Sequence, residues 1–312
     1  MRQLNEDFLE KFDNEYKELL RCIVNDPDLD MQIRENYLNV YYKGGSILKI
    51  KPRSFDIDKM YFFVHTEEGK SSTDVKKDNT VLTELKEKRN TLLSLLPSDP
   101  KEYFRQAKEV MDIWDSALAE KVEHNEKKEQ QQIILANSKN TDYIVLDVEY
   151  AVSRNSEFNH MKAAPIKKEV PRFDIIAIKD GCLKVIELKK GLGAVAGTSG
   201  VKEHIDCFTY TIAKDDSRLF NKEMQILLEQ KQRLKLLDQS LSINNNRPSF
   251  AFAFADEAGK DEFASFVNKC REKGYKKKSN WIYCLPDFSE RSKVLVAGGI
   301  VSLNPGRTIP IY

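Results

Sequence analysis

The pattern of hydrophobic and polar positions changes several times in the first third of the chain. Residues 4–25 carry apolar side chains at helical spacing, which predicts a helix. Aromatic and β-branched residues between 40 and 64, interrupted by glycines and a proline, then predict a small sheet. After a charged stretch, residues 81–96 return to a helical pattern.

A proline-punctuated segment, LPSDP at 96–100, follows that helical pattern and predicts a domain boundary. Residues 1–98 are therefore expected to form a small N-terminal α+β module. Residues 99–312 are expected to form a second, larger domain. At 312 residues the chain exceeds one average domain, and its hydrophobic content of 41% supplies enough apolar surface for two cores.

The second domain has the element order of an α/β core. A helical pattern at 100–136 is followed by strand-like segments and then by further helices and strands. In order, the predicted elements are strands at 142–153, 172–179 and 182–190, helices at 201–213 and 217–241, a strand at 247–257, a helix at 260–273 and a strand at 281–285. This order predicts a central sheet flanked by helices.

Charge and cysteine usage narrow the class of protein. Fifty Lys and Arg stand against 49 Asp and Glu, a net charge of +1, so any nucleic-acid contact must come from local patches. The five cysteines are odd in number and never form a CxxC, which argues against a disulfide framework or a thiolate zinc site. Without an apolar leader or an apolar run of about 18 residues, a cytoplasmic protein without a membrane partner is expected.

The dipeptide Asp180-Gly181 lies between two apolar, strand-like segments. A two-residue Asp-Gly loop predicts a type I′ hairpin, because both central residues need positive φ. Counting outward from a first pair between Lys179 and Cys182, the register places Asp174 directly opposite Glu187. Directly opposed residues have Cβ atoms roughly 5 Å apart, where two carboxylates repel unless a cation lies between them.

The same register gives this pair of acids two basic neighbours. Lys189 lies two residues beyond Glu187 and so shares its face of the strand, and Arg172 is expected opposite Lys189. Carboxylate oxygens select Mg²⁺ or Mn²⁺, which binds through one or two carboxylates plus substrate phosphate. These residues predict a metal at Asp174 and Glu187, with Lys189 as the catalytic lysine. Arg172 and Lys190 are candidates for contact with substrate phosphate.

This pattern resembles the signature of the PD-(D/E)XK, or restriction-endonuclease-like, nuclease superfamily: an acid on one strand, a spacer, then (D/E)-x-K on the next. Here the signature reads Asp174, twelve residues, then Glu187-Leu188-Lys189, although Phe173 replaces the family's proline. The resemblance covers about residues 105–285. It implies an α-β-β-β-α-β core with a mixed sheet and a Mg²⁺- or Mn²⁺-dependent enzyme that hydrolyses phosphodiester bonds in DNA. An endonuclease acting in defence against foreign DNA, or in repair, fits that family.

The resemblance leaves the source of a further metal-binding acid open. Many members of the family supply one from the first core helix, where Glu126 and Glu129 continue the apolar stripe. Glu149, on the strand before the hairpin, is a second candidate.

Other interpretations also remain open. Asp147 and Glu149 form either an exposed strand end or a D-x-E metal pair resembling that of the DEDD exonucleases. A catalytically inactive nuclease fold, used as a nucleic-acid-binding or assembly module, is the non-enzyme alternative. The N-terminal module is expected either to recognise substrate or to form a homodimer. His204 is interpreted as a helix-surface or cap residue.

Overall fold

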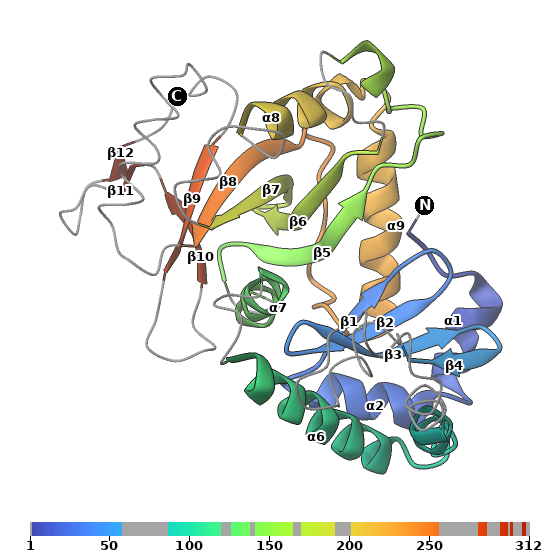
Figure 1. The fold of residues 1–312 in the computed structure, drawn as a ribbon. Helices are drawn as coiled ribbons and strands as arrows, with labels where there is room; N and C mark the ends of the chain where they lie inside the picture. Colours follow the sequence, from blue (N-terminus) through green and yellow to red (C-terminus); the bar gives the residue numbers. More distant parts are fainter. Residues whose placement is uncertain are drawn as a thin grey trace. The chain divides into compact units, whose positions relative to one another are not determined.

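The chain folds into two units, each built around its own sheet (Figure 1). In this computed structural model, the first unit contains residues 1–131 and 229–236, and the second contains 132–228 and 237–312. The structure describes residues 2–57, 87–119, 126–137, 141–164, 170–190, 201–255, 280–285, 294–298, 300–301 and 308–309. It describes the backbone alone at 113–119, 126–130, 189–190, 201–202 and in the described residues after 253.

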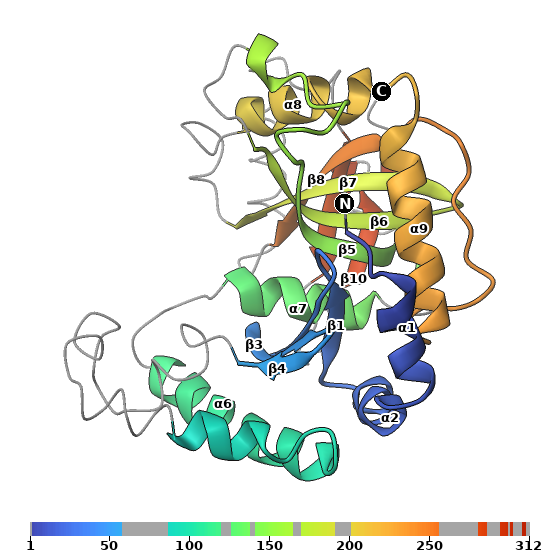
Figure 2. The same ribbon diagram turned by 90° about the vertical axis from the view of Figure 1, so that its right-hand side faces the viewer.

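The first unit is an antiparallel four-stranded sheet with helices, in the strand order β1-β2-β3-β4. Its elements are α1 (Glu6–Asp13), α2 (Lys17–Asn25), β1 (Asp30–Ile33), β2 (Leu38–Tyr42), β3 (Gly45–Lys51), β4 (Ser54–Asp56) and α6 (Pro100–Ala119), with further helical residues at 87–93. Buried and half-buried residues alternate along β2, as expected of a strand with one core-facing side. Helix α6 packs against α2 and β3, and both views show α2 and α6 on the same side of the sheet (Figures 1 and 2).

The expected small sheet is confirmed, but the expected single helix over 4–25 is wrong. The chain turns at residues 14–16 and forms two helices. The rings of Phe12 and Tyr16 remain in contact across this turn, with centroids 5.5 Å apart. The apolar spacing therefore reflects one shared core rather than one continuous helix. The predicted strand residues at 58–64 and helix residues at 81–86 lie outside the described residues.

The division between the units differs from the boundary predicted at 98/99, because helices beyond that point pack with the N-terminal sheet. The Tyr103 hydroxyl in α6 donates a 2.6 Å hydrogen bond to the Ile47 carbonyl of β3. Near the end of α9 (Leu219–Arg233), the Gln230 side chain bonds both backbone groups of Leu4. One turn of a late helix thereby becomes part of the N-terminal unit.

The second unit contains the mixed sheet that the sequence predicts, flanked by helices. Its elements are the last residues of α7 (Glu126–Ala136), β5 (Ile144–Ala151), β6 (Arg172–Lys179), β7 (Cys182–Lys190), α8 (Val201–Thr209), the first part of α9, β8 (Ser249–Ala255), β9 (Asn280–Leu285) and β10 (Val294–Gly298), with a separate pair β11 (Ile300–Val301) and β12 (Thr308–Ile309). The sheet order is β10-β9-β8-β7-β6-β5. Strands β7, β8 and β9 are parallel to one another, and the other neighbours are antiparallel.

Some predicted elements of this unit have different ends or lie outside the described residues. Helix α8 ends at Thr209 and α9 ends at Arg233, shortly before Lys235, which has a φ of 58°. A residue in the left-handed region cannot continue a helix, which explains why α9 stops short of the predicted 241. The predicted helix at 260–273 is not among the described residues. Strand β10 was not predicted.

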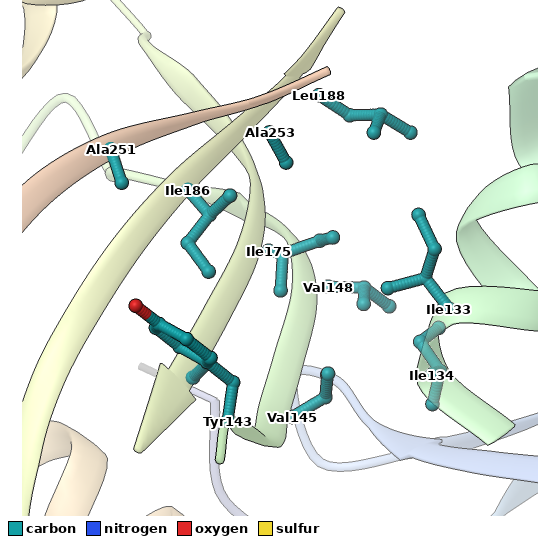
Figure 3. Close-up of a cluster of buried hydrophobic side chains, with 11 residues drawn as sticks. Ile133, Ile134, Tyr143, Val145, Val148, Ile175, Ile186, Leu188, Ala251 and Ala253 are labelled. Atoms are coloured by element: carbon teal, nitrogen blue, oxygen red, sulfur yellow. The ribbon is translucent and has the colours of Figure 1, made fainter. Parts of the chain in front are cut away.

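Both faces of the central strands are covered, as the apolar composition of the hairpin predicts. On one face, Ile133 and Ile134 of α7 pack on Ile175, Ile186 and other buried side chains of the sheet (Figure 3). Figures 1 and 2 show α8 on the opposite side of this sheet. Phe208 of α8 stacks on Phe250 of β8 with ring centroids 5.1 Å apart, and Phe250 also contacts the rings of Phe173 and Phe252. A separate group of ring contacts joins Phe220 of α9 to Tyr150 and Phe158.

The predicted hairpin turn is confirmed. Asp180 and Gly181 have φ values of 52° and 74°, the positive values that a type I′ turn requires. The side-chain amides of Asn244 and Asn246 donate to the Cys182 sulfur beside the turn, at 3.2 and 3.4 Å. These two hydrogen bonds stabilise the thiolate, so the pKa of Cys182 is lowered from its ordinary value.

We expect Cys182 to be alkylated at lower pH than Cys22, because the thiolate is the nucleophile and burial raises the pKa of Cys22. Iodoacetamide labelling across a pH series, followed by peptide mass spectrometry, measures both profiles in one sample. Asn246→Ala removes a donor to the sulfur and should move only the Cys182 profile to higher pH. An unchanged profile in that variant would show that the amide does not stabilise the thiolate.

Candidate active site

The predicted register is confirmed along most of the hairpin. Paired residues run from Lys179 with Cys182 at the turn to Ile175 with Ile186. The ladder ends there, one pair short of the expected pairing of Asp174 with Glu187. No ladder pair therefore joins Asp174 and Glu187.

The ladder between β6 and β7 stops at the acids, while each strand stays paired with its other neighbour. Before Asp174, Phe173 pairs with Tyr150 of β5. From Glu187 onward, β7 remains paired with β8, where Glu187 lies alongside Phe252. Asp174 and Glu187 therefore mark a fork in the sheet, where ladder hydrogen bonds between β6 and β7 are no longer made. A fork leaves in-plane space that side chains can enter.

Asp174 uses this fork to bind the backbone of the neighbouring strand. In an antiparallel ladder every second pair exchanges hydrogen bonds, and the pair following Ile175 and Ile186 in that series joins Phe173 and Leu188. The Leu188 amide instead donates to Asp174 Oδ2 at 2.8 Å. The Asp174 carboxylate is thereby held next to the peptide that follows Glu187.

Glu187 is buried and faces a histidine from the covering helix. Glu187 is only 3% exposed, and its Oε1 lies 2.9 Å from Nδ1 of His204 in α8. His204 is itself 6% exposed, so its interpretation as a helix-surface residue is wrong. The neighbouring strand supplies Phe252, whose ring contacts Phe250 with centroids 5.0 Å apart. Aromatic packing excludes water here and strengthens the interaction of the carboxylate with a partner charge or dipole.

Three predicted site residues have side chains outside the described part of the structure. Lys189 and Lys190 belong to β7, where their backbones pair with Phe254 and Ala255 of β8. Glu129 belongs to α7. Their proposed roles remain predictions.

Arg172 does not occupy its predicted place. On one edge of β6 it pairs with Ala151 of β5, and on the other edge the ladder with β7 ends at Ile175 and Ile186, before the predicted pair with Lys189. Its guanidinium is 61% exposed and forms a 3.0 Å ion pair with Oε2 of Glu149, a residue that adopts a φ of 53°. Arg172 and Glu149 therefore interact with each other.

Asp147 is also placed differently from either sequence interpretation. It is 0% exposed and pairs with Ile176 midway along β5, so it is not an exposed strand end. Two residues on, Glu149 has a φ of 53° and forms an ion pair with Arg172, so the regular alternation that would bring a D-x-E pair to one face of the strand is interrupted.

The carboxylate oxygens of Asp174 and Glu187 are the type of ligand that a hard divalent cation binds. Mg²⁺ keeps several waters and binds proteins through one or two carboxylates together with substrate phosphate. Among the residues that the structure describes, no group of three or more His, Cys, Asp or Glu side chains is placed to hold a metal. An ion bound by these two acids would thus take its other ligands from water and substrate phosphate rather than from a complete protein cage.

Comparison with known proteins found no relative of this chain. No family model, no curated protein and no solved structure matches the chain. Within the described part of the chain, no helix is long and apolar enough to cross a membrane. The residues of the fork therefore carry the functional interpretation alone.

His204 is the site residue that the sequence interpretation missed. The signal that points to it is helical spacing: His204 lies four residues before Phe208, which packs on Phe250 with ring centroids 5.1 Å apart. Residues four apart share a helix face, so His204 belongs to the buried side of α8. Its partner Glu187 lies on a different element, and local spacing does not indicate that contact.

Proposed function

We propose that the second unit is a restriction-endonuclease-like core that hydrolyses phosphodiester bonds in DNA with a divalent cation. The element order α7, β5, β6, β7, α8 and, after α9, β8 supports the proposal, as does the mixed sheet. The observation that carries it is the hydrogen bond from the Leu188 amide to Asp174 Oδ2, which holds one acid beside the next, Glu187. Two acids held at the fork of a sheet, with a lysine two residues on, suit phosphoryl chemistry.

In this proposal each residue has a distinct task. Asp174 and Glu187 would hold Mg²⁺ or Mn²⁺, which when bound polarises the scissile phosphodiester and activates a water. Lys189, two residues after Glu187, would supply the positive charge that stabilises the nucleophile or the developing negative charge. Lys190 is proposed to contact substrate phosphate. Arg172 is not included, because its guanidinium interacts with Glu149.

The DEDD-like alternative, which uses Asp147 and Glu149, remains a prediction from the sequence. The inactive module remains a distinct outcome of the test below. Homodimer formation, a role in defence or repair, and recognition of substrate by the N-terminal unit remain predictions from the sequence.

The test is a cleavage assay on circular and linear duplex DNA with Mg²⁺, with Mn²⁺ and with EDTA. We expect metal-dependent cleavage that Lys189→Ala slows roughly 10²- to 10³-fold, as loss of one group that stabilises transition-state charge does. Nicking of the circle identifies endonuclease action. Lys184→Ala is the matched control, since Lys184 lies on the same strand and contacts Ser249 instead.

Two outcomes would contradict the proposal in different ways. If Lys189→Ala cleaves as fast as the parent, the catalytic role of Lys189 is wrong. If the parent binds DNA but does not cleave it with either metal, the unit is a binding module.

A further inference from the structure

We infer that His204 is a positioning residue, which holds the Glu187 carboxylate in the orientation needed to bind the divalent cation. The inference rests on the proposed function, because it concerns Glu187 as a metal ligand. Nothing in the sequence signature requires a histidine at this place, and only the fold brings α8 over β7.

The geometry of the pair is specific. Nδ1 of His204 lies 2.9 Å from Oε1 of Glu187, within hydrogen-bonding distance, and both side chains are more than nine-tenths buried. A proton on Nδ1 of His204 interacts favourably with a carboxylate oxygen at this distance. Because the surroundings are apolar and aromatic, such an interaction is stronger than it would be in water.

At each of the two predicted metal ligands, a polar group of the protein contacts one carboxylate oxygen. One oxygen of Asp174 accepts from the Leu188 amide at 2.8 Å, and one oxygen of Glu187 faces the imidazole of His204. An ionised carboxylate has about four acceptor sites, so a bond at one oxygen is compatible with a cation at the other. Groups that hydrogen-bond to metal ligands fix the orientation of those ligands and tune their affinity for the ion.

A glutamate needs this support more than an aspartate does. Its carboxylate is separated from the backbone by three rotatable bonds, and fixing a long side chain costs rotamer entropy. A neighbour that selects one rotamer in the absence of the ion removes that cost from metal binding. His204 supplies this selection from a buried helix face rather than from a loop.

The experiment measures metal binding directly, by Mn²⁺ titration of the intact protein without DNA, using electron paramagnetic resonance to count unbound Mn²⁺. We expect His204→Leu to raise the Mn²⁺ dissociation constant roughly 10- to 100-fold, the usual effect of removing a group that supports a metal ligand. His204→Asn should restore most of the affinity, because the asparagine amide nitrogen lies near the position of Nδ1. Glu187→Gln should lose the site.

Two controls separate positioning from loss of structure. Phe220→Leu removes ring contacts with Tyr150 and Phe158 in the same unit, without altering Glu187 or His204. It should lower stability while leaving the Mn²⁺ dissociation constant unchanged. In cleavage assays, His204→Leu should need more metal for half-maximal rate but recover most of the parent rate at saturating metal.

The outcomes distinguish this inference from the function on which it rests. If Glu187→Gln loses Mn²⁺ binding while His204→Leu binds like the parent, the positioning role is wrong and the metal site stands. If His204→Asn is as weak as His204→Leu, the amide donor is not what matters and the inference also fails. If the parent shows no saturable Mn²⁺ binding, both the metal site and the role of His204 are wrong.

Discussion

Replacing Glu187 with glutamine is expected to reduce metal-dependent DNA cleavage by at least about 10²-fold. The stabilisation of phosphoryl-transfer charge by a bound ion is worth several kcal/mol, and about 1.36 kcal/mol corresponds to each factor of ten. Glutamine preserves the size and shape of the buried side chain and can still contact His204. It removes the negative charge that holds the cation, so the loss should fall on activity rather than on folding.

The matched control for Glu187→Gln is Asp180→Asn on the same hairpin. It makes the same change from acid to amide, and Asn-Gly supports a type I′ turn as Asp-Gly does. We expect Asp180→Asn to cleave at the parent rate. Initial rates on plasmid DNA at saturating Mg²⁺, with thermal unfolding measured on the same samples, provide the comparison. A Glu187→Gln enzyme with the parent rate would remove Glu187 from the mechanism.

Ile186→Ala is expected to lower the free energy of unfolding of the second unit by roughly 2–5 kcal/mol, the usual range for buried isoleucine to alanine. Ile186 is fully buried and lies among the side chains that pack between the sheet and α7 (Figure 3). Truncation removes apolar contacts and leaves a cavity that close-packed neighbours fill only in part. The adjacent residue along β7 is Glu187, so the variant also tests whether core packing supports the site.

Urea titration followed by far-UV circular dichroism measures the change, and hydrogen exchange in peptides from β5 to β8 assigns it to the second unit. Val170→Ala is the comparison variant, because Val170 is 38% exposed. It should change stability by less than about 0.5 kcal/mol, as surface substitutions usually do. Equal losses for Ile186→Ala and Val170→Ala would contradict the central position of Ile186 in this core.

The hairpin could be predicted because its determinants are local. The Asp-Gly pair sets the turn through two positive φ angles, and the turn then sets the register of the next pairs. The register could not indicate where the ladder stops. The ladder stops where the Asp174 carboxylate, rather than the backbone of β6, accepts from the Leu188 amide.

The boundary between the units shows a similar limit. The prolines near residue 98 end one helical segment, but α6 beyond them still packs on the first sheet, through contacts such as that of Tyr103 with Ile47.

The short strand β1 carries buried polar residues, including Gln32, whose amide oxygen accepts a hydrogen bond from Lys231 at 2.7 Å. Strand β1 was not predicted, because its buried polar residues interrupt the apolar pattern of a strand. The partner of Gln32 is 199 positions away along the chain, so the sequence near β1 does not indicate that Gln32 is buried.

For the candidate site, the sequence by itself determined which residues are proposed to carry the chemistry: Asp174, Glu187 and Lys189 follow from residue type and strand spacing. Tertiary structure decided their surroundings. It turned Asp174 toward the Leu188 amide and brought His204 from α8 against Glu187, while Arg172 went to Glu149. Spacing within a strand is a local property, whereas a contact between a helix and a strand depends on how the whole unit packs.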